Sequence, residues 1–89
     1  MSQHKITFSF SPRWKEELVC SCSHGSFILE MPMGITTVYL PPEERWQKLA
    51  PAWAIPHWST LHDQLTAWCR QQNIPLAIEA TSAVYADAK

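Results

Sequence analysis

The spacing of apolar residues changes at Pro41 and Pro42, and this change constrains the fold more than any other feature of the chain. Before the two prolines, apolar side chains recur at every second position, as they do in strands that bury one face. After them, apolar residues recur every three or four positions, as in helices that bury one stripe. Strands followed by helices predict a sheet packed against a helical layer.

Three or four strands are predicted before the prolines. Residues 5–11 alternate between apolar and polar side chains. Residues 17–22 and 27–31 form a predicted hairpin, because their connection contains Gly25, which can adopt the positive φ that tight turns need. The β-branched and aromatic residues at 35–40 predict a further strand. Together these segments predict an antiparallel meander.

Two helices are predicted after the prolines, with a break or kink at Pro51, because proline lacks an N–H group and clashes with the preceding turn. The second helix is the stronger pattern and is expected to end at Asn73, with Pro75 just beyond it. Residues 74–80 predict a last strand that returns to the sheet. Residues 81–89 are expected either to prolong that strand or to fray.

The length of 89 residues predicts one domain over residues 1–89. The expected fold class is α+β: an antiparallel sheet of three to five strands packed against one layer of two helices, in the order β-β-β-(β)-α-α-β. The hydrophobic fraction of 46% lies above that of low-hydrophobicity disordered chains.

The charge of the chain excludes several classes of partner. The formal net charge is −1, and the basic residues are scattered among acidic ones. A nucleic-acid-binding protein carries a basic face that neutralises phosphates, and no such face is predicted here. The same reasoning argues against an anionic membrane surface.

The chain also lacks a signal-peptide pattern, and its three cysteines are too few for a disulfide scaffold. A cytosolic protein is therefore expected, and no cofactor is predicted.

Two cysteines and a histidine alternate at Cys20, Cys22 and His24, so that a strand would direct them to one face. Thiols and imidazoles bind metals, but structural zinc sites usually have the spacing C-x2-C. Buried cysteine also packs as a small apolar residue, and Leu18 continues the same face. We therefore predict a core row, with His24 in the turn. The alternative is a metal-binding or thiol-redox protein that uses Cys20, Cys22, His24 and Cys69.

No arrangement in the sequence predicts catalysis. Cys69 precedes Arg70, but it lies on the apolar stripe of its helix, where burial raises the pKa of a thiol. Glu43 and Glu44 are adjacent and suit the start of a helix better than an acid–base pair. We expect a protein that is not an enzyme.

The tryptophans carry the strongest functional signal. Trp53 and Trp58 flank the predicted break between the helices, where apolar cover is poorest. Tryptophan is enriched at the energetic centres of protein interfaces. The predicted partner-binding residues are Trp53, Trp58, His57 and Trp14. The expected function is that of a small non-catalytic protein-binding module, such as an inhibitor, an immunity- or antitoxin-like protein or an accessory subunit, whose partner is another protein or a second copy of the chain.

Overall fold

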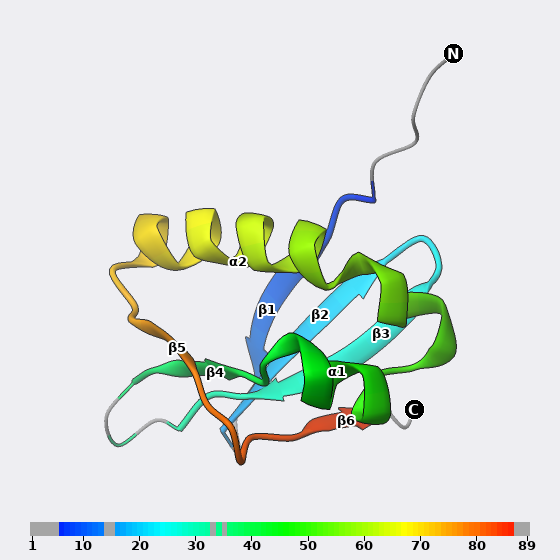
Figure 1. Ribbon diagram of the computed structural model, residues 1–89. Coiled ribbons are helices and arrows are strands. Elements are labelled where there is room, and N and C mark those ends of the chain that lie inside the picture. Colours follow the sequence, from blue (N-terminus) through cyan, green and yellow to red (C-terminus); the bar gives the residue numbers. More distant parts are fainter. Residues whose placement is uncertain (1–5, 14–15, 33, 35, 87–89) are drawn as a thin grey trace.

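A computed structural model describes residues 6–13, 16–32, 34 and 36–86. It confirms the α+β class, with strands that precede the helices and a helical layer on one face of the sheet (Figure 1). The elements are β1 (Ser9–Arg13), β2 (Glu17–Cys22), β3 (Gly25–Glu30), β4 (Val38–Leu40), α1 (Glu43–Leu49), the 3-10 helix η1 (Ala52–His57), α2 (Trp58–Gln72), β5 (Leu76–Ile78) and β6 (Val84–Ala86).

The first three strands form the predicted antiparallel meander. Phe10 lies opposite Cys20, and Cys20 lies opposite Phe27, so the apolar side chains of the three strands share one face. That face is covered by the helices and contains the core. The opposite face of these strands carries serines, glutamates and a few apolar residues and is called the open face below.

The second edge of β3 is shared by two separate strands. Tyr39 of β4 lies opposite Glu30, and β6 then pairs with residues 27–29 of the same edge. The chain leaves β3 after β4 because Pro41 and Pro42 follow it, and proline cannot donate a ladder hydrogen bond. Strand β6 pairs with the part of the β3 edge that β4 does not occupy.

The sheet is mixed, because β5 runs parallel to β4, with Tyr39 opposite Ala77. Parallel neighbours need a long crossover connection, and α1, η1 and α2 supply it. This parallel pair differs from the entirely antiparallel sheet that the sequence predicts.

Trp46 anchors the helical layer to the sheet. Its side chain is fully buried, and its ring meets the ring of Phe27 edge-to-face with 5.2 Å between the centroids. The indole Nε1 donates a hydrogen bond to the carbonyl oxygen of Ala54 at 3.1 Å, so one side chain joins α1, η1 and β3. Helix α2 adds the buried side chains of Leu61, Leu65 and Cys69.

The helix boundaries follow the predicted signals. Helix α1 ends at Leu49, before Pro51, and η1 separates it from α2, so the predicted break at Pro51 is confirmed. Asn73 adopts the left-handed conformation with φ of 58° and caps α2. None of the helices in the described part of the chain is long and apolar enough to cross a membrane.

Two segments differ from the sequence-based expectation. Strand β1 continues through Pro12 to Arg13, beyond residue 11, where the predicted strand ends, and an edge strand tolerates this proline. Within residues 81–89, where prolongation of the last strand or fraying is expected, β6 forms as a strand of its own. Arg45 of α1 holds the segment that leads into β6, because its guanidinium donates hydrogen bonds to the backbone carbonyl oxygens of Ser82 and Thr81.

Candidate functional site

Trp53, a predicted contact residue, is half-buried against the β2–β3 turn. Its ring lies 6.0 Å from the imidazole of His24 and 6.0 Å from the ring of Phe27, measured between centroids. A Cβ atom on Gly25 would approach atoms of the indole to 3.1–3.2 Å. Glycine therefore allows the turn to lie against this ring.

Trp58, the second predicted contact residue, is half-buried at the start of α2. Its Nε1 donates to the carbonyl oxygen of Pro41 at 2.9 Å, and its ring stacks on His62 with 5.2 Å between the centroids. His57 is half-buried at the end of η1, and Trp14 lies outside the described residues. The structure thus places Trp53, His57 and Trp58 around η1, and their role in partner binding stays a prediction.

The predicted row of Cys20, Cys22 and His24 extends from the core into the β2–β3 turn. Cys20 and Cys69 are buried in the core, whereas Cys22 is half-buried at its margin. His24 lies in the turn and is exposed, and its backbone N–H donates to Sγ of Cys22 at 3.4 Å. Burial raises the pKa of the Cys20 thiol well above its usual value, with a smaller contribution from Cys69, and burial raises the pKa of Cys69 to about 11.

Across residues 6–13, 16–32, 34 and 36–86, no three His, Cys, Asp or Glu side chains are grouped so that they could hold a metal ion. The alternative set of Cys20, Cys22, His24 and Cys69 is therefore not brought together as a metal centre in the structure. The raised pKa values of the two buried thiols also oppose the thiolate form that metals and disulfide exchange require.

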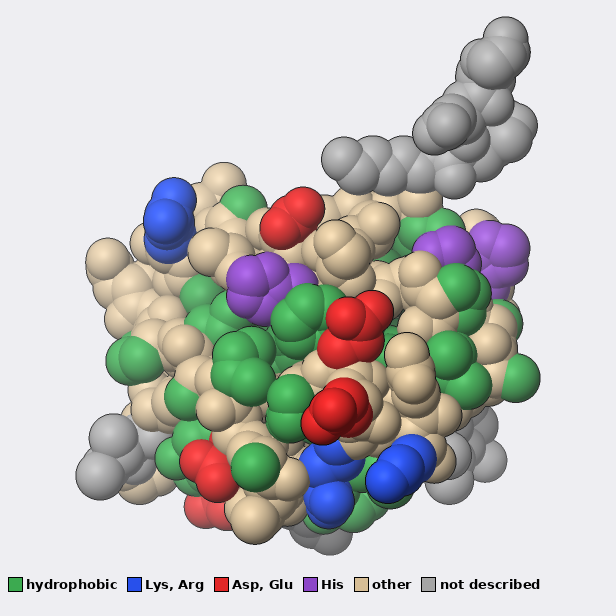
Figure 2. All heavy atoms as spheres, in the orientation of Figure 1, with side chains coloured by type: hydrophobic (Ala, Val, Ile, Leu, Met, Phe, Trp, Pro, Cys, Tyr) green, Lys and Arg blue, Asp and Glu red, His purple; other side chains and the backbone are tan. Residues whose placement is uncertain are grey.

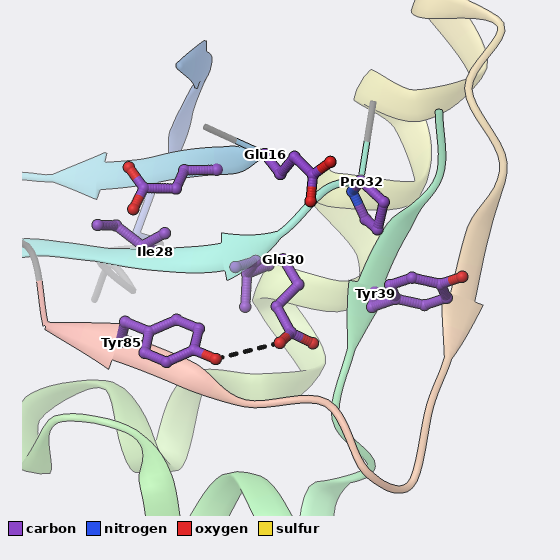
Figure 3. Close-up of a pocket in the computed structure, with 8 residues that line it drawn as sticks. Glu16, Ile28, Glu30, Pro32, Tyr39 and Tyr85 are labelled. Atoms are coloured by element: carbon purple, nitrogen blue, oxygen red, sulfur yellow. Dashed lines mark hydrogen bonds between the residues drawn. The ribbon is translucent and has the colours of Figure 1, made fainter. Parts of the chain in front are cut away.

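The open face of the sheet carries a hollow of about 390 Å³ (Figure 3). It lies where β4 and β6 meet along the edge of β3, and its lining includes Glu16, Glu17, Ile28, Glu30, Tyr39 and Tyr85. Tyr85 is half-exposed, at 49% of its maximal area, and is one of the most exposed large apolar side chains in the described chain. We take this hollow as the candidate functional site.

The strand register arranges the open face in rows that cross the sheet. Arg13, Glu17, Glu30 and Tyr39 form one row, because each lies opposite the next. The guanidinium Nη2 of Arg13 lies 2.9 Å from Oε1 of Glu17. The row therefore places two carboxylates side by side in its centre, with a cation at one end and a phenol at the other.

A second row consists of Ser11, Val19, Ile28 and Tyr85. Ile28 is buried although it lies on the open face, at 4% exposure. A third row contains the small residues Ser9, Ser21 and Ser26. The surface beside the hollow is therefore made of small or uncharged side chains, which leave it accessible to another molecule.

Tyr85 and Glu30 are joined across β6 and β3. The hydroxyl of Tyr85 donates to Oε2 of Glu30 at 3.1 Å, as the dashed line in Figure 3 shows. This hydrogen bond, together with the negative charge of Glu30 and a small effect of burial, raises the pKa of the Tyr85 phenol. Tyr39 comes from β4 on the other side of Glu30, and its hydroxyl points away from that carboxylate.

Glu16 borders the hollow in an uncommon backbone conformation, with φ of 63°. A non-glycine residue in the left-handed region costs about 1–3 kcal/mol and persists where the surroundings hold it. The carbonyl oxygen of Glu16 accepts a hydrogen bond from the backbone N–H of Met31 at 3.1 Å, which fixes the chain beside the hollow.

A second hollow of about 350 Å³ lies between α2 and β5. Its lining includes His62, Cys69, Ile74, Leu76 and Ile78, and Ile78 is 47% exposed on the edge strand. Figure 2 shows hydrophobic side chains gathered on this face of the molecule, between α2 and the strands β4 and β5. It lacks the grouped charges of the open-face hollow, so it is the weaker candidate.

Comparison with models of protein families, with curated proteins and with solved structures finds no match to the chain.

Sequence reasoning missed the open-face hollow. The signal available was the position of Glu17, Glu30 and Tyr39 on the polar face of their predicted strands. Their juxtaposition depends on which residues lie opposite one another, and Tyr85 belongs to a segment whose pairing with β3 no local pattern predicts.

Proposed function

We propose that the protein is a small, non-catalytic protein-binding module of the cytoplasm, and that the open face of its sheet is the recognition surface. The observation that carries the proposal is the hollow of about 390 Å³ beside the half-exposed ring of Tyr85, on the face of the sheet opposite the helices. Antiparallel sheets commonly leave one face to solvent, but such a face is usually polar throughout.

Two further features support recognition over catalysis. Tyrosine is enriched at the energetic centres of protein interfaces, because a large ring and a hydroxyl act from one rigid side chain. The buried thiols of Cys20 and Cys69 have raised pKa values, which disfavour them as nucleophiles. An inhibitor, an immunity-type protein or an accessory subunit needs a contact surface of this kind and no reacting group.

The experiment compares two surfaces with variants of matched exposure. Tagged wild-type protein, Tyr85→Ala and Ile78→Ala are used to capture partners from the host lysate, and each captured protein is then quantified. Tyr85 and Ile78 are 49% and 47% exposed, but Ile78 lines the second hollow. We expect a partner that Tyr85→Ala retains at least about tenfold less than the other two proteins, as loss of a central interface residue predicts.

Other outcomes would place the partner contact on a different surface of the protein. A partner lost with Ile78→Ala and kept with Tyr85→Ala would place the contact at the second hollow and contradict the proposal. A fourth variant, Trp58→Ala, tests the sequence-based prediction. Loss of the partner with this variant alone, in a protein that stays folded, would favour the tryptophans around η1.

A further inference from the structure

The open-face hollow has the size of a site for a side chain or a small ligand. Its volume of about 390 Å³ falls within the range of roughly 300–1,000 Å³ that is typical of ligand pockets. Glu17, Ile28 and Glu30 of its lining belong to the open face, so an occupant approaches from the side of the sheet opposite the helices.

The charge of the hollow selects a cation. Three of its lining residues are glutamates, Glu16, Glu17 and Glu30, and none of its described lining residues is Lys, Arg or His. The guanidinium of Arg13 contacts Glu17 from β1, on the side away from Glu30. A cleft lined by one sign of charge concentrates ligands of the opposite sign.

The spacing of the carboxylates disfavours a metal ion. Calcium and magnesium need several oxygen ligands at about 2.0–2.6 Å from one point. In the described part of the chain no three acidic, histidine or cysteine side chains are grouped for such coordination, Glu16, Glu17 and Glu30 included. Carboxylates around a hollow that do not converge on one point suit a larger cation that spans them.

A guanidinium group fits this arrangement better than an ammonium group. It is planar, it presents five N–H donors, and it forms paired hydrogen bonds with carboxylates. It also stacks on aromatic rings, and Glu30 lies between Tyr85 and Tyr39, which come from the two strands that flank the hollow (Figure 3). Lysine is a compact and strongly hydrated charge, and it gains less from a flat aromatic wall.

From these contacts we propose that the hollow receives an arginine side chain of a partner protein, with the guanidinium between Glu17 and Glu30 and against the ring of Tyr85. This inference rests on the proposed protein-binding function and names the group that the partner presents. The rows of small and uncharged residues beside the hollow, which include Ser11, Val19 and Ser21, allow the backbone around that arginine to approach the sheet.

The test uses capped tripeptides as probes. Acetyl-Gly-Arg-Gly-amide is titrated into 15N-labelled protein, and the citrulline counterpart, which has nearly the same shape without the charge, is titrated in parallel. We expect saturable shifts at the amides of Glu17, Glu30 and Tyr85 with the arginine peptide, and at least about tenfold weaker binding with citrulline. Raising the salt from about 50 mM to about 200 mM should weaken binding, because the hollow is exposed.

Variants that remove one carboxylate at a time test which glutamates bind the arginine peptide. Glu30→Gln and Glu17→Gln are each expected to weaken the arginine peptide about tenfold, since each removes one charged acceptor. Glu43→Gln is the matched control, because it removes the same charge from α1, outside the hollow, and should leave the affinity unchanged. The dispersion of the amide spectrum reports folding, and either of the first two variants suffices if the other unfolds.

The outcomes separate this inference from the proposed function. Equal affinity for arginine and citrulline, or unchanged affinity in both hollow variants, overturns the arginine site. Shifts of the same amides with calcium chloride but not with the peptide would overturn it in favour of a metal. If Tyr85→Ala loses a host partner while the arginine peptide does not bind, the protein-binding proposal stands and this inference fails. If the peptide binds but no host protein depends on Tyr85, the assignment to a partner protein fails, while binding of a guanidinium group in the hollow stands.

Discussion

Glu17 and Glu30 lie directly opposite each other on β2 and β3, and both carboxylates belong to the open face. Like charges in this position destabilise a sheet by about 0.2–1 kcal/mol. Arg13 offsets the charge of Glu17, and the hydroxyl of Tyr85 donates to Glu30. These contacts reduce the repulsion between the two carboxylates without removing it, and a like-charged pair kept at a hollow is the pattern expected where binding has a cost in stability.

The first prediction is that removing this repulsion stabilises the protein. Glu30→Gln should raise the free energy of unfolding by up to about 1 kcal/mol, because glutamine still accepts the hydrogen bond of Tyr85. The gain should be larger at low salt, and urea unfolding at two salt concentrations measures it. Glu43→Gln should have the opposite effect, since Glu43 lies in the first turn of α1, where the helix dipole favours a negative charge. Destabilisation by Glu30→Gln at low salt would contradict the prediction.

The second prediction concerns the phenol of Tyr85, whose pKa the hydrogen bond to Glu30 raises. The folded pKa lies above the unfolded one, so the stabilisation is fully present below about pH 10 and is lost as the pH rises through the folded value. Absorbance of tyrosinate during an alkaline titration, in wild type and in Tyr85→Phe, isolates this group. Glu30→Gln should move the titration of Tyr85 to lower pH, and an unchanged titration would show that Glu30 does not contact the phenol.

The third prediction concerns access to the thiols. Cys20 and Cys69 are buried, and Cys22 is half-buried beside an exposed turn. A disulfide reagent should therefore modify one thiol rapidly in the native protein and all three in denaturant. Cys22→Ala should remove the rapid phase, and its persistence in that variant would contradict the assigned burial.

The fourth prediction follows from the raised pKa of Cys69, about 11 against an ordinary 9.0. The unfolded thiol ionises at lower pH than the folded one, so stability from this group is complete below about pH 9 and is lost between about pH 9 and pH 11. Between about pH 8 and about pH 10 the loss should be about 1 kcal/mol. Cys69→Ala should reduce the alkaline loss, with Cys20 as the remaining buried thiol. The same pH dependence in wild type and variant would refute this assignment.

The fifth prediction concerns Gly25 and Trp53. Gly25 has φ of 151°, and an added Cβ would meet the indole at 3.1–3.2 Å. Gly25→Ala should cost about 1–3 kcal/mol of stability, the range for overpacking at a close contact. Thermal or urea unfolding measures the cost, and Trp53→Leu in the same chain should lower the additional cost of alanine. Equal costs in both backgrounds would locate the strain in the backbone alone.

Local patterns of the sequence account for much of the fold. The two-residue period predicted the meander, Pro51 predicted the break between α1 and α2, and Asn73 predicted the end of α2. Each of these features depends on a residue and its near neighbours. The parallel pairing of β4 with β5 and the separate strand β6 depend on contacts between distant segments, and no local spacing encodes them.

The hollow escaped prediction for the same reason. Glu17 and Glu30 become neighbours only through the register of the hairpin, and Tyr85 reaches them only because β6 occupies the edge that β4 leaves. The tryptophans are predicted as contact residues from their residue type alone, whereas the hollow depends on which distant residues lie side by side. Within the structure, the ring of Trp53 contacts Phe27, and the indole of Trp58 donates to the carbonyl oxygen of Pro41.

One edge of β3 pairs with β4 at one end and with β6 at the other, and this division has a consequence for local unfolding. Strand β6 has three residues, and its detachment would take Tyr85 away from Glu30 while Trp46 and the helices keep the core closed. Segments of this kind open at lower free energy than the whole domain. An occupant that contacts Tyr85 and Glu30 together would hold β6 in place, so occupancy and closure of this segment would rise together, and amide hydrogen exchange in β6 would slow in proportion to the bound fraction.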